Sequence, residues 1–268
     1  MPLEIIIALL LLGLFVGLMA GMLGIGGGGI LVPILSALFL HLGYPPEDIV
    51  HMALGTSMAT IVTTSVASAR AHHRKGSVAW HSWRAMTPGV LAGTFLATFL
   101  VAQLNATFLA AFFAAFMAFV AWQMWRPLRL ASDHQPKKVE LVAAGGVIGG
   151  VSALVSIGGG SLTVPYLSWR NHPLTQAVGT SAALGLPIAV TGTIGYLING
   201  WSHSQFNAGI VGYVYLPAVV LLSVASFISA PLGVRVAHRL PVPVLKKIFA
   251  LLLVTISVRM FWQVWSAV

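Results

Sequence analysis

Long apolar runs follow one another along almost the whole chain, with only short polar stretches between them. Eight of the ten runs approach the ~20 residues that a helix needs to cross a bilayer, but Ile30–Leu42 and Leu162–Trp169 are too short. The remaining runs are Leu3–Leu23, Ile49–Ala69, Trp83–Val101, Phe108–Trp125, Leu141–Val155, Thr175–Ile198, Val211–Leu232 and Val244–Val264. The pattern predicts an all-α polytopic membrane protein with about eight full spans and two short half-helices.

Composition supports a membrane environment. Of the 268 residues, 58% are hydrophobic and 7% are charged, whereas a soluble domain has about 25% charged residues. The formal charge is +9, but the basic residues lie between the apolar runs rather than along one face, which argues against a nucleic-acid partner. The chain contains no cysteine, so it can form neither a disulfide nor a thiolate metal site. The opening MPLEII contains no basic residue, so we do not expect a cleaved signal peptide.

Two halves of the chain repeat one another, which predicts a single membrane domain over residues 1–268 with internal repeats 1–130 and 138–268. GIGGGGILVPIL at Gly24 matches SIGGGSLTVPYL at Ser156, and ALGTSMA at Ala53 matches AVGTSAA at Ala177. TPGVL at Thr87 parallels LPAVV at Leu216, and WQMW at Trp122 parallels WQVW at Trp262. Similar motifs in the same order indicate an internal duplication.

The two short runs occupy corresponding places, each directly after a glycine run. Paired interrupted segments of this kind indicate a transporter binding site, because unwound backbone survives in a membrane only where protein or a water-filled cavity meets it. Each glycine run should lead into the N-terminus of a half-helix, which is an anion site. We expect positive φ angles at Gly27 and Gly159. The candidate substrate-binding residues here are Gly26, Gly27, Gly28, Pro33, Gly158, Gly159, Gly160 and Pro165.

Hydroxyl groups on the helices that follow add hydrogen-bond donors, from Thr56, Ser57, Thr180 and Ser181. These hydroxyls could instead bond back to their own helices, and the glycines could serve only close helix packing. The first run also contains G-x-G-x-x-G, but a dinucleotide site needs a soluble strand before it and a soluble helix after it. The sequence leaves the first two alternatives open and disfavours the third.

The basic residues predict the orientation, because Lys and Arg collect on the cytoplasmic side. If the basic connections are inside, all but Arg259 of the 14 Lys and Arg residues are cytoplasmic. The connection after the first Gly-Thr-Ser motif is then inside and the connection after the second is outside. The repeats are therefore expected to be inverted, with both termini extracytoplasmic. Arg259 is interpreted as reaching the membrane interface, with an anion-binding role as the alternative.

No acidic residue lies within a predicted span, since all five fall at segment ends or in connections. Intramembrane carboxylates are typical of cation and proton sites, so their absence favours an anion. His51 lies at the edge of a span and is interpreted as a polar helix-end residue, with a proton-linked role as the alternative. His72 and His73 are interpreted as part of a solvated loop. No catalytic triad, metal site or cofactor motif is present in the predicted spans, so we expect neither an enzyme nor a cofactor.

The paired glycine runs, each with its following Val-Pro and Gly-Thr-Ser, resemble the TauE/SafE sulfite exporter family, also called the toluene sulfonate uptake permease (TSUP) family. The resemblance covers nearly the whole chain. It implies a secondary permease of the bacterial inner membrane for small sulfur-containing anions such as sulfite, sulfate, thiosulfate or organosulfonates. Ser161 stands where the first half has Gly29, so the two halves are not equivalent.

Two alternatives remain at this point: a non-transporting membrane protein, either an assembly partner or an embedded enzyme, and a transporter of a neutral solute or cation. The expected partners are the lipid bilayer and the anion. A homo-oligomer is compatible with the sequence, which does not give the number of subunits.

Overall fold

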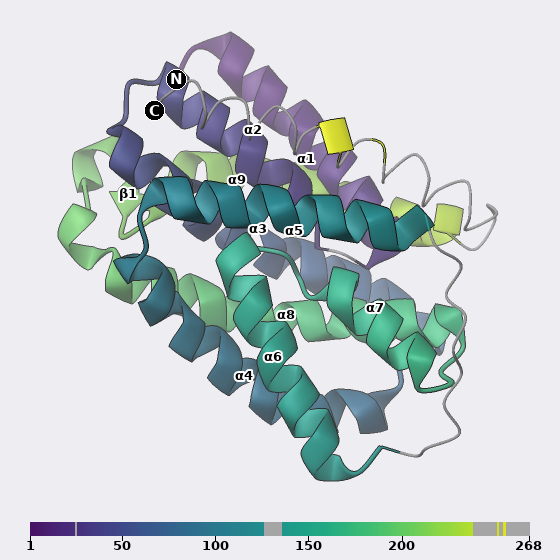
Figure 1. The fold of residues 1–268 in the computed structure, drawn as a ribbon. Coiled ribbons are helices and arrows are strands. Elements are labelled where there is room, and N and C mark those ends of the chain that lie inside the picture. The colour runs from purple at the N-terminus through teal and green to yellow at the C-terminus, as the bar shows by residue number, and fades with distance from the viewer. Residues whose placement is uncertain (25, 126–135, 238–250, 252–253, 256–268) are drawn as a thin grey trace.

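The chain folds into a bundle of membrane-length helices with two short helices inside it (Figure 1). The computed structural model describes residues 1–24, 26–125, 136–237, 251 and 254–255. Its named elements are α1 (Leu3–Leu23), α2 (Gly28–His41), α3 (Pro46–Arg74), α4 (Trp80–Gln103), α5 (Ala106–Trp125), α6 (Lys138–Val155), α7 (Gly160–Trp169), α8 (Leu174–Asn199), η1 (Trp201–His203), η2 (Phe206–Ala208), β1 (Ile210–Val211), β2 (Val214–Tyr215) and α9 (Leu216–Ala237).

Most of the predicted segments correspond to helices. Seven helices of the described part of the chain are long and apolar enough to cross a membrane. α2 has 14 residues and α7 has 10. At a rise of about 1.5 Å per residue, both fall short of the ~30 Å hydrocarbon core. Of the predicted segment Val244–Val264, which would be the eighth full span, only residues 251 and 254–255 are described.

One predicted segment is wrong at its start. Val211–Leu232 was expected to be a helix from its first residue, but β1 and β2 form an antiparallel hairpin there, and α9 begins only at Leu216. Gly209 and Gly212 have φ angles of 75° and 57°, which a right-handed helix does not accommodate. The two glycines therefore delay the start of the helix.

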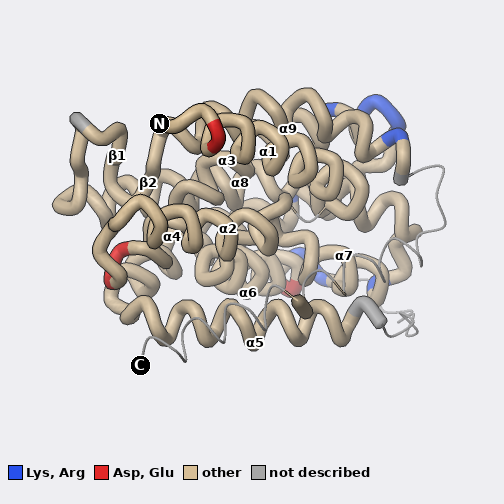
Figure 2. The backbone as a smooth tube through the Cα atoms, turned by 90° about the horizontal axis from the view of Figure 1, so that it is seen from above, with Lys and Arg blue, Asp and Glu red and all other residues tan. Residues whose placement is uncertain are grey.

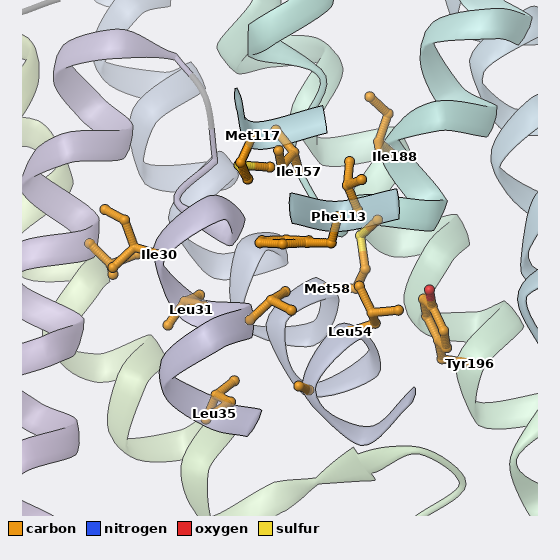
Figure 3. Close-up of a cluster of buried hydrophobic side chains, with 14 of the residues drawn as sticks. Ile30, Leu31, Leu35, Leu54, Met58, Phe113, Met117, Ile157, Ile188 and Tyr196 are labelled. Carbon is orange, nitrogen blue, oxygen red and sulfur yellow. The ribbon is translucent and has the colours of Figure 1, made fainter. Parts of the chain in front are cut away.

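α3 and α8 form the centre of the bundle. They pack against each other, and 78% of the most apolar 18-residue window of α3 is buried. α1 packs along α9 on one side, and α4 packs along α6 on another (Figure 1). The buried apolar core joins these layers, and Figure 3 shows Phe113 of α5 among Met58, Met117 and Ile157. Because Ile157 belongs to this core, the chain between α6 and α7 is held firmly in place.

Glycines allow α1 and α9 to approach closely. A Cβ atom on Gly13 would lie 2.8 Å from the Leu222 carbonyl oxygen, and a Cβ atom on Gly21 would overlap the carbonyl of Ala230. The residue numbers of the contacting pairs increase in the same direction in both helices, so α1 and α9 run parallel. This is the small-residue packing typical of membrane helices.

Glycines also allow α4 and α6 to approach closely. Gly89 packs against Val142, and Gly93 packs against Gly146. These two helices also run parallel, since both sets of residue numbers rise together. Close packing describes these glycines of the long helices, and it applies to the first glycine run as well, since a Cβ atom on Gly28 would overlap the Ser156 carbonyl oxygen.

Charge is distributed unevenly between the two ends of the bundle. Glu47 and Asp48 lie in the first turn of α3, whereas Arg74 lies in its last turn. Figure 2 shows the Lys and Arg segments on the side of the molecule away from β1 and β2. The described basic residues are Arg70, Arg74, Lys75, Arg84, Lys137, Lys138, Arg170 and Arg235.

The prediction that His72 lies in a solvated loop is wrong. α3 continues to Arg74, and His72 is only 1% exposed. Its Nδ1 atom lies 3.0 Å from Ser77 Oγ, and its Nε2 atom lies 3.3 Å from the Gly21 carbonyl oxygen. His72 thus connects the end of α3 to α1. His73 is exposed, as expected.

Candidate functional site

Two breaks in the helical backbone define the candidate site. We call Gly24, Gly26 and Gly27, between α1 and α2, the first break, and residues 156–159, between α6 and α7, the second break. Gly27 and Gly159 directly precede α2 and α7, with φ angles of 82° and 77°. The expected positive φ angles at these two glycines are confirmed. Both short helices therefore begin from a left-handed glycine, a conformation that costs other residues about 1–2 kcal/mol.

The two breaks touch each other. A Cβ atom on Gly26 would lie 2.8 Å from both the Cα and the N atoms of Gly158, and a Cβ atom on Gly158 would lie 3.0 Å from the Gly26 Cα atom. Real Cβ atoms essentially never come as close as the first of these distances. The contact therefore requires glycine at position 26 and brings the starts of α2 and α7 together inside the bundle.

Each break is also held by a helix of the other half of the chain. Ser181 Oγ on α8 donates to the Gly24 carbonyl oxygen of the first break at 2.8 Å. Ser156 Oγ of the second break donates to the Leu54 carbonyl oxygen on α3, also at 2.8 Å. All four residues are buried. The first bond pairs a carbonyl group of the first break, and the second pairs the buried hydroxyl of the second break.

The two threonines of the Gly-Thr-Ser motifs make corresponding contacts. The backbone N–H of Tyr215, just before α9, donates to Thr56 Oγ1 at 3.0 Å. The backbone N–H of Ala79, just before α4, donates to Thr180 Oγ1 at 2.8 Å. Thr56 and Thr180 therefore accept hydrogen bonds from distant segments, and Ser181 donates one. The alternative, in which these hydroxyls bond back to their own helices, does not describe these contacts.

Ser57 differs from these three residues. Its hydroxyl is fully buried and has no hydrogen-bond partner among the described residues. A buried hydroxyl without a partner carries a desolvation cost of about 1–3 kcal/mol. Of the four predicted hydroxyl donors, Ser181 donates its hydrogen to Gly24, Thr56 and Thr180 accept hydrogen bonds, and the Ser57 hydroxyl makes no hydrogen bond within the described residues.

The two prolines lie further into the short helices than expected, because α2 and α7 begin two residues earlier than predicted. Pro33 is the sixth residue of α2, and Pro165 is the sixth residue of α7. Each proline lacks the N–H that would bond to the carbonyl four residues before it, on Gly29 and Ser161 respectively. The missing bond therefore costs more than a missing N–H in the first turn.

A narrow crevice runs between the breaks and the two central helices. It contains about 190 Å³ of space between atoms, none of it wide enough for a water-sized sphere. Its lining contains glycines, alanines and three hydroxyl residues of α3 and has no charged side chain: Ala20, Gly24, Gly26, Thr64, Ser65, Ser68, Gly158, Ala182 and Gly185. The crevice reaches Gly26 and Gly158 of the predicted site and extends along α3 beyond Ser57.

Sequence reasoning missed the hydroxyl face of α3, from which Thr64 and Ser68 line this crevice. Thr60, Thr64 and Ser68 recur every four residues within an apolar helix, and this spacing places them on one face. Thr64 Oγ1 donates to Ser226 Oγ on α9 at 2.8 Å, whereas Ser68 Oγ is buried without a partner among the described residues. The four-residue spacing was the signal that could have identified this face.

His51 lies near the opposite end of α3 and is 6% exposed. Its Nδ1 atom lies 3.2 Å from the Glu47 carbonyl oxygen, and its Nε2 atom lies 3.1 Å from the Val101 carbonyl oxygen. Its ring stacks on Tyr213 with the centroids 5.1 Å apart. Burial, and secondarily the charge of Asp48, raises the pKa of the Tyr213 phenol above its ordinary value. His51 thus links α3 to the end of α4 through the Val101 carbonyl oxygen, beside the neutral phenol of Tyr213.

No group of three or more potential metal ligands is present among the described residues. The ionised residues that do pair there lie at the ends of the bundle. Arg170 pairs with Glu140, and His203 Nδ1 lies 3.2 Å from Asp48 Oδ1. The centre of the bundle is therefore a site of backbone groups and hydroxyls.

Comparison with known proteins places the chain in a family. Residues 9–260 match the sulfite exporter TauE/SafE family. The chain is 35% identical over 261 residues to a Haemophilus influenzae protein named "probable membrane transporter protein", covering 96% of this chain and 98% of that protein. It is 26% identical over 237 residues to a Methanocaldococcus jannaschii protein of similar name, covering 87% and 86% of the two chains. No solved structure matches. The chain therefore belongs to the TauE/SafE sulfite exporter family, and it is a membrane transporter.

Proposed function

We propose that the protein transports a small sulfur-containing oxyanion, such as sulfite, sulfate, thiosulfate or an organosulfonate, and binds it where the two breaks meet. The observation that carries this proposal is the contact of Gly26 with Gly158, which brings the starts of α2 and α7 together. The family description names sulfite, and sulfite belongs to this class of anions. The protein acts as a permease, with no role as an enzyme.

Electrostatics favour an anion at this place. The N-terminus of a helix carries about half a positive charge, together with N–H groups that no helical carbonyl can reach. These groups belong to Gly28 and Gly29 in α2, and to Gly160 and Ser161 in α7. No carboxylate lines the crevice, so a metal cation would find no charged ligand there. Backbone N–H groups and hydroxyls are a sufficient set of donors for an oxyanion.

The hydroxyls of α3 are expected to complete the site. Ser57 has a free buried hydroxyl, and Ser65 and Ser68 line the crevice directly. In the absence of substrate, an unpaired buried hydroxyl is unfavourable, and an anion would supply the missing acceptor. The proposed substrate site keeps all the residues predicted from the sequence: Gly26–Gly28, Pro33, Thr56, Ser57, Gly158–Gly160, Pro165, Thr180 and Ser181.

The proposal includes inverted repeats and a defined orientation. Because α1 corresponds to α6 and α4 to α9, the parallel pairs α1 with α9 and α4 with α6 are equivalent under the repeat, and the charge distribution supplies the argument for inversion. The basic end of the bundle is assigned to the cytoplasm by the positive-inside tendency. Both termini then lie on the extracytoplasmic side of a bacterial inner membrane.

The crevice is too narrow for a water-sized sphere, so an oxyanion does not fit into it in the described conformation. Transport requires α3 or α8 to separate from the breaks. In transporters of this kind, one bundle rocks against another around a central site. We therefore expect either α3 or α8 to move when substrate enters the site.

Flux through reconstituted vesicles tests the proposal. Purified protein in liposomes should carry radiolabelled sulfite, sulfate or thiosulfate faster than empty liposomes, and chloride should not compete. Ser68→Ala should weaken transport, because Ser68 lines the crevice with an unpartnered hydroxyl. Ser36→Ala is the matched control, since Ser36 is also a buried serine whose hydroxyl has no partner in the described structure, but it does not line the crevice. Absence of flux from a folded protein would favour a non-transporting role, and flux of a neutral solute or cation alone would refute the anion site.

A further inference from the structure

A second cavity lies at the basic end of the bundle, away from the breaks. It opens between the first turns of α4 and α6 and has a volume of about 290 Å³. Three of its six lining residues carry basic side chains: His81, Arg84 and Lys138, beside Ala85, Pro136 and Leu141. We propose that this cavity binds the phosphate headgroup of an anionic glycerophospholipid from the surrounding membrane.

The charges of this cavity are available to a ligand. Neither Arg84 nor Lys138 has an ion-pair partner in the described part of the chain. The nearby acidic residue Glu140 pairs with Arg170 instead. The first turns of α4 and α6 also direct the positive ends of two helix dipoles toward the cavity. Basic pockets between transmembrane helices are typical binding sites of anionic lipid headgroups.

The surroundings of the cavity favour a lipid over a free anion. Trp80 is 39% exposed and packs edge-to-face against Trp83, with ring centroids 5.4 Å apart. Exposed tryptophans of this kind mark the headgroup level of a bilayer. Arg84, Pro88 and Leu91 follow at spacings of four and three residues and are all exposed, so they lie on one face of α4. A lipid with its phosphate at Arg84 would place an acyl chain along Leu91.

Thermal unfolding of the full-length protein in delipidated detergent solution tests the site. Dioleoylphosphatidylglycerol should raise the melting temperature, and dioleoylphosphatidylcholine should not. The variant Arg84→Ala/Lys138→Ala should need about 30-fold more phosphatidylglycerol for the same shift, since each basic side chain near an anionic lipid contributes roughly fivefold. Native mass spectrometry should show the corresponding loss of bound phosphatidylglycerol.

The control variant is Arg74→Ala/Lys75→Ala, which removes two exposed charges from the same end of the bundle but outside the cavity. Equal loss in both variants would mean general surface attraction and would overturn the site. Equal protection by the two lipids would overturn it as well. Equal protection by inorganic phosphate at the same concentration would assign the cavity to a free anion instead. If the double variant does not fold, Arg84→Gln and Lys138→Gln singly should each weaken binding about fivefold.

Discussion

Gly26 and Gly158 lie in direct backbone contact, although 132 positions separate them in the chain. Gly26 also has a φ angle of 75°. Gly26→Ala should therefore strain the backbone by about 1–2 kcal/mol and also push the two breaks apart. We expect it to abolish the stabilisation of the protein by sulfite, measured as a shift in melting temperature.

Gly43→Ala provides the matched control for this substitution. Gly43 has a φ angle of 78°, and an added Cβ atom would meet nothing within 4 Å. Gly43→Ala should introduce the same backbone strain as Gly26→Ala but leave the stabilisation by sulfite unchanged. A full sulfite response in Gly26→Ala would show that the contact between the breaks does not form the site.

The outermost position of the first run should tolerate change. Gly29 lies inside α2, and the corresponding position of the second half is Ser161. Gly29→Ser should therefore be the mildest substitution in the run, with sulfite flux close to that of the parent. Flux as low as that of Gly26→Ala would mean that the two halves of the site have different steric requirements.

Alanine variants of Ser57 and Ser181 should distinguish a hydroxyl that binds substrate from one that stabilises the fold. Ser181→Ala removes a buried hydrogen bond to Gly24 and should lower the free energy of unfolding by about 0.5–1.5 kcal/mol, with more lost if the Gly24 carbonyl stays unpaired. Ser57→Ala removes a hydroxyl that has no partner, so stability should hardly change. If Ser57 donates to the anion, its removal should weaken binding by about 3- to 100-fold. Unchanged anion binding in Ser57→Ala would show that Ser57 only packs within the protein and does not contact the substrate.

We expect His51 to contribute to the stability of the fold and not to carry protons during transport. Both of its ring nitrogens face backbone carbonyls, so His51→Gln, which reaches fewer acceptors, should lower the free energy of unfolding by about 1 kcal/mol. The pH profile of transport should keep its shape, because the residue lies away from the crevice. A profile that loses a transition in the variant would instead establish a proton-linked role.

Topology can be tested with reporter fusions at two points. A fusion after Lys138 should report the cytoplasm, since Lys138 lies at the basic end of the bundle. A fusion at Val268 should report the extracytoplasmic side. Signals from the same side at both points would contradict the inverted arrangement.

The sequence was sufficient to predict the long helices and the breaks. Continuous apolar runs determine membrane helices strongly, and α1 has the predicted bounds, Leu3–Leu23. The positive φ angle at Gly27 followed from the glycine run itself. The hairpin before α9 was missed because Val211, Val214 and Tyr215 are as apolar as a span, and hydropathy alone cannot distinguish a buried hairpin from a helix.

Tertiary contacts explain the other errors. His72 is polar and borders a basic stretch, so its sequence context indicates solvent, but its burial depends on the position of Gly21 in α1. The partners of Thr56 and Thr180 lie 159 and 101 residues away. No local pattern specifies such a pairing. The exact lining of the crevice depends in the same way on how α1, α3 and α8 meet.

The meeting of Gly26 with Gly158 has a consequence for mutational scanning. A contact made of main-chain atoms has no side chain to remove, so replacing its neighbours with alanine one at a time deletes nothing from it. Only substitutions that add atoms can reveal it, and the smallest of these, a single methyl group, is already too large at Gly26. A saturation scan of the chain should therefore record Gly26 through intolerance of every larger residue, including conservative ones.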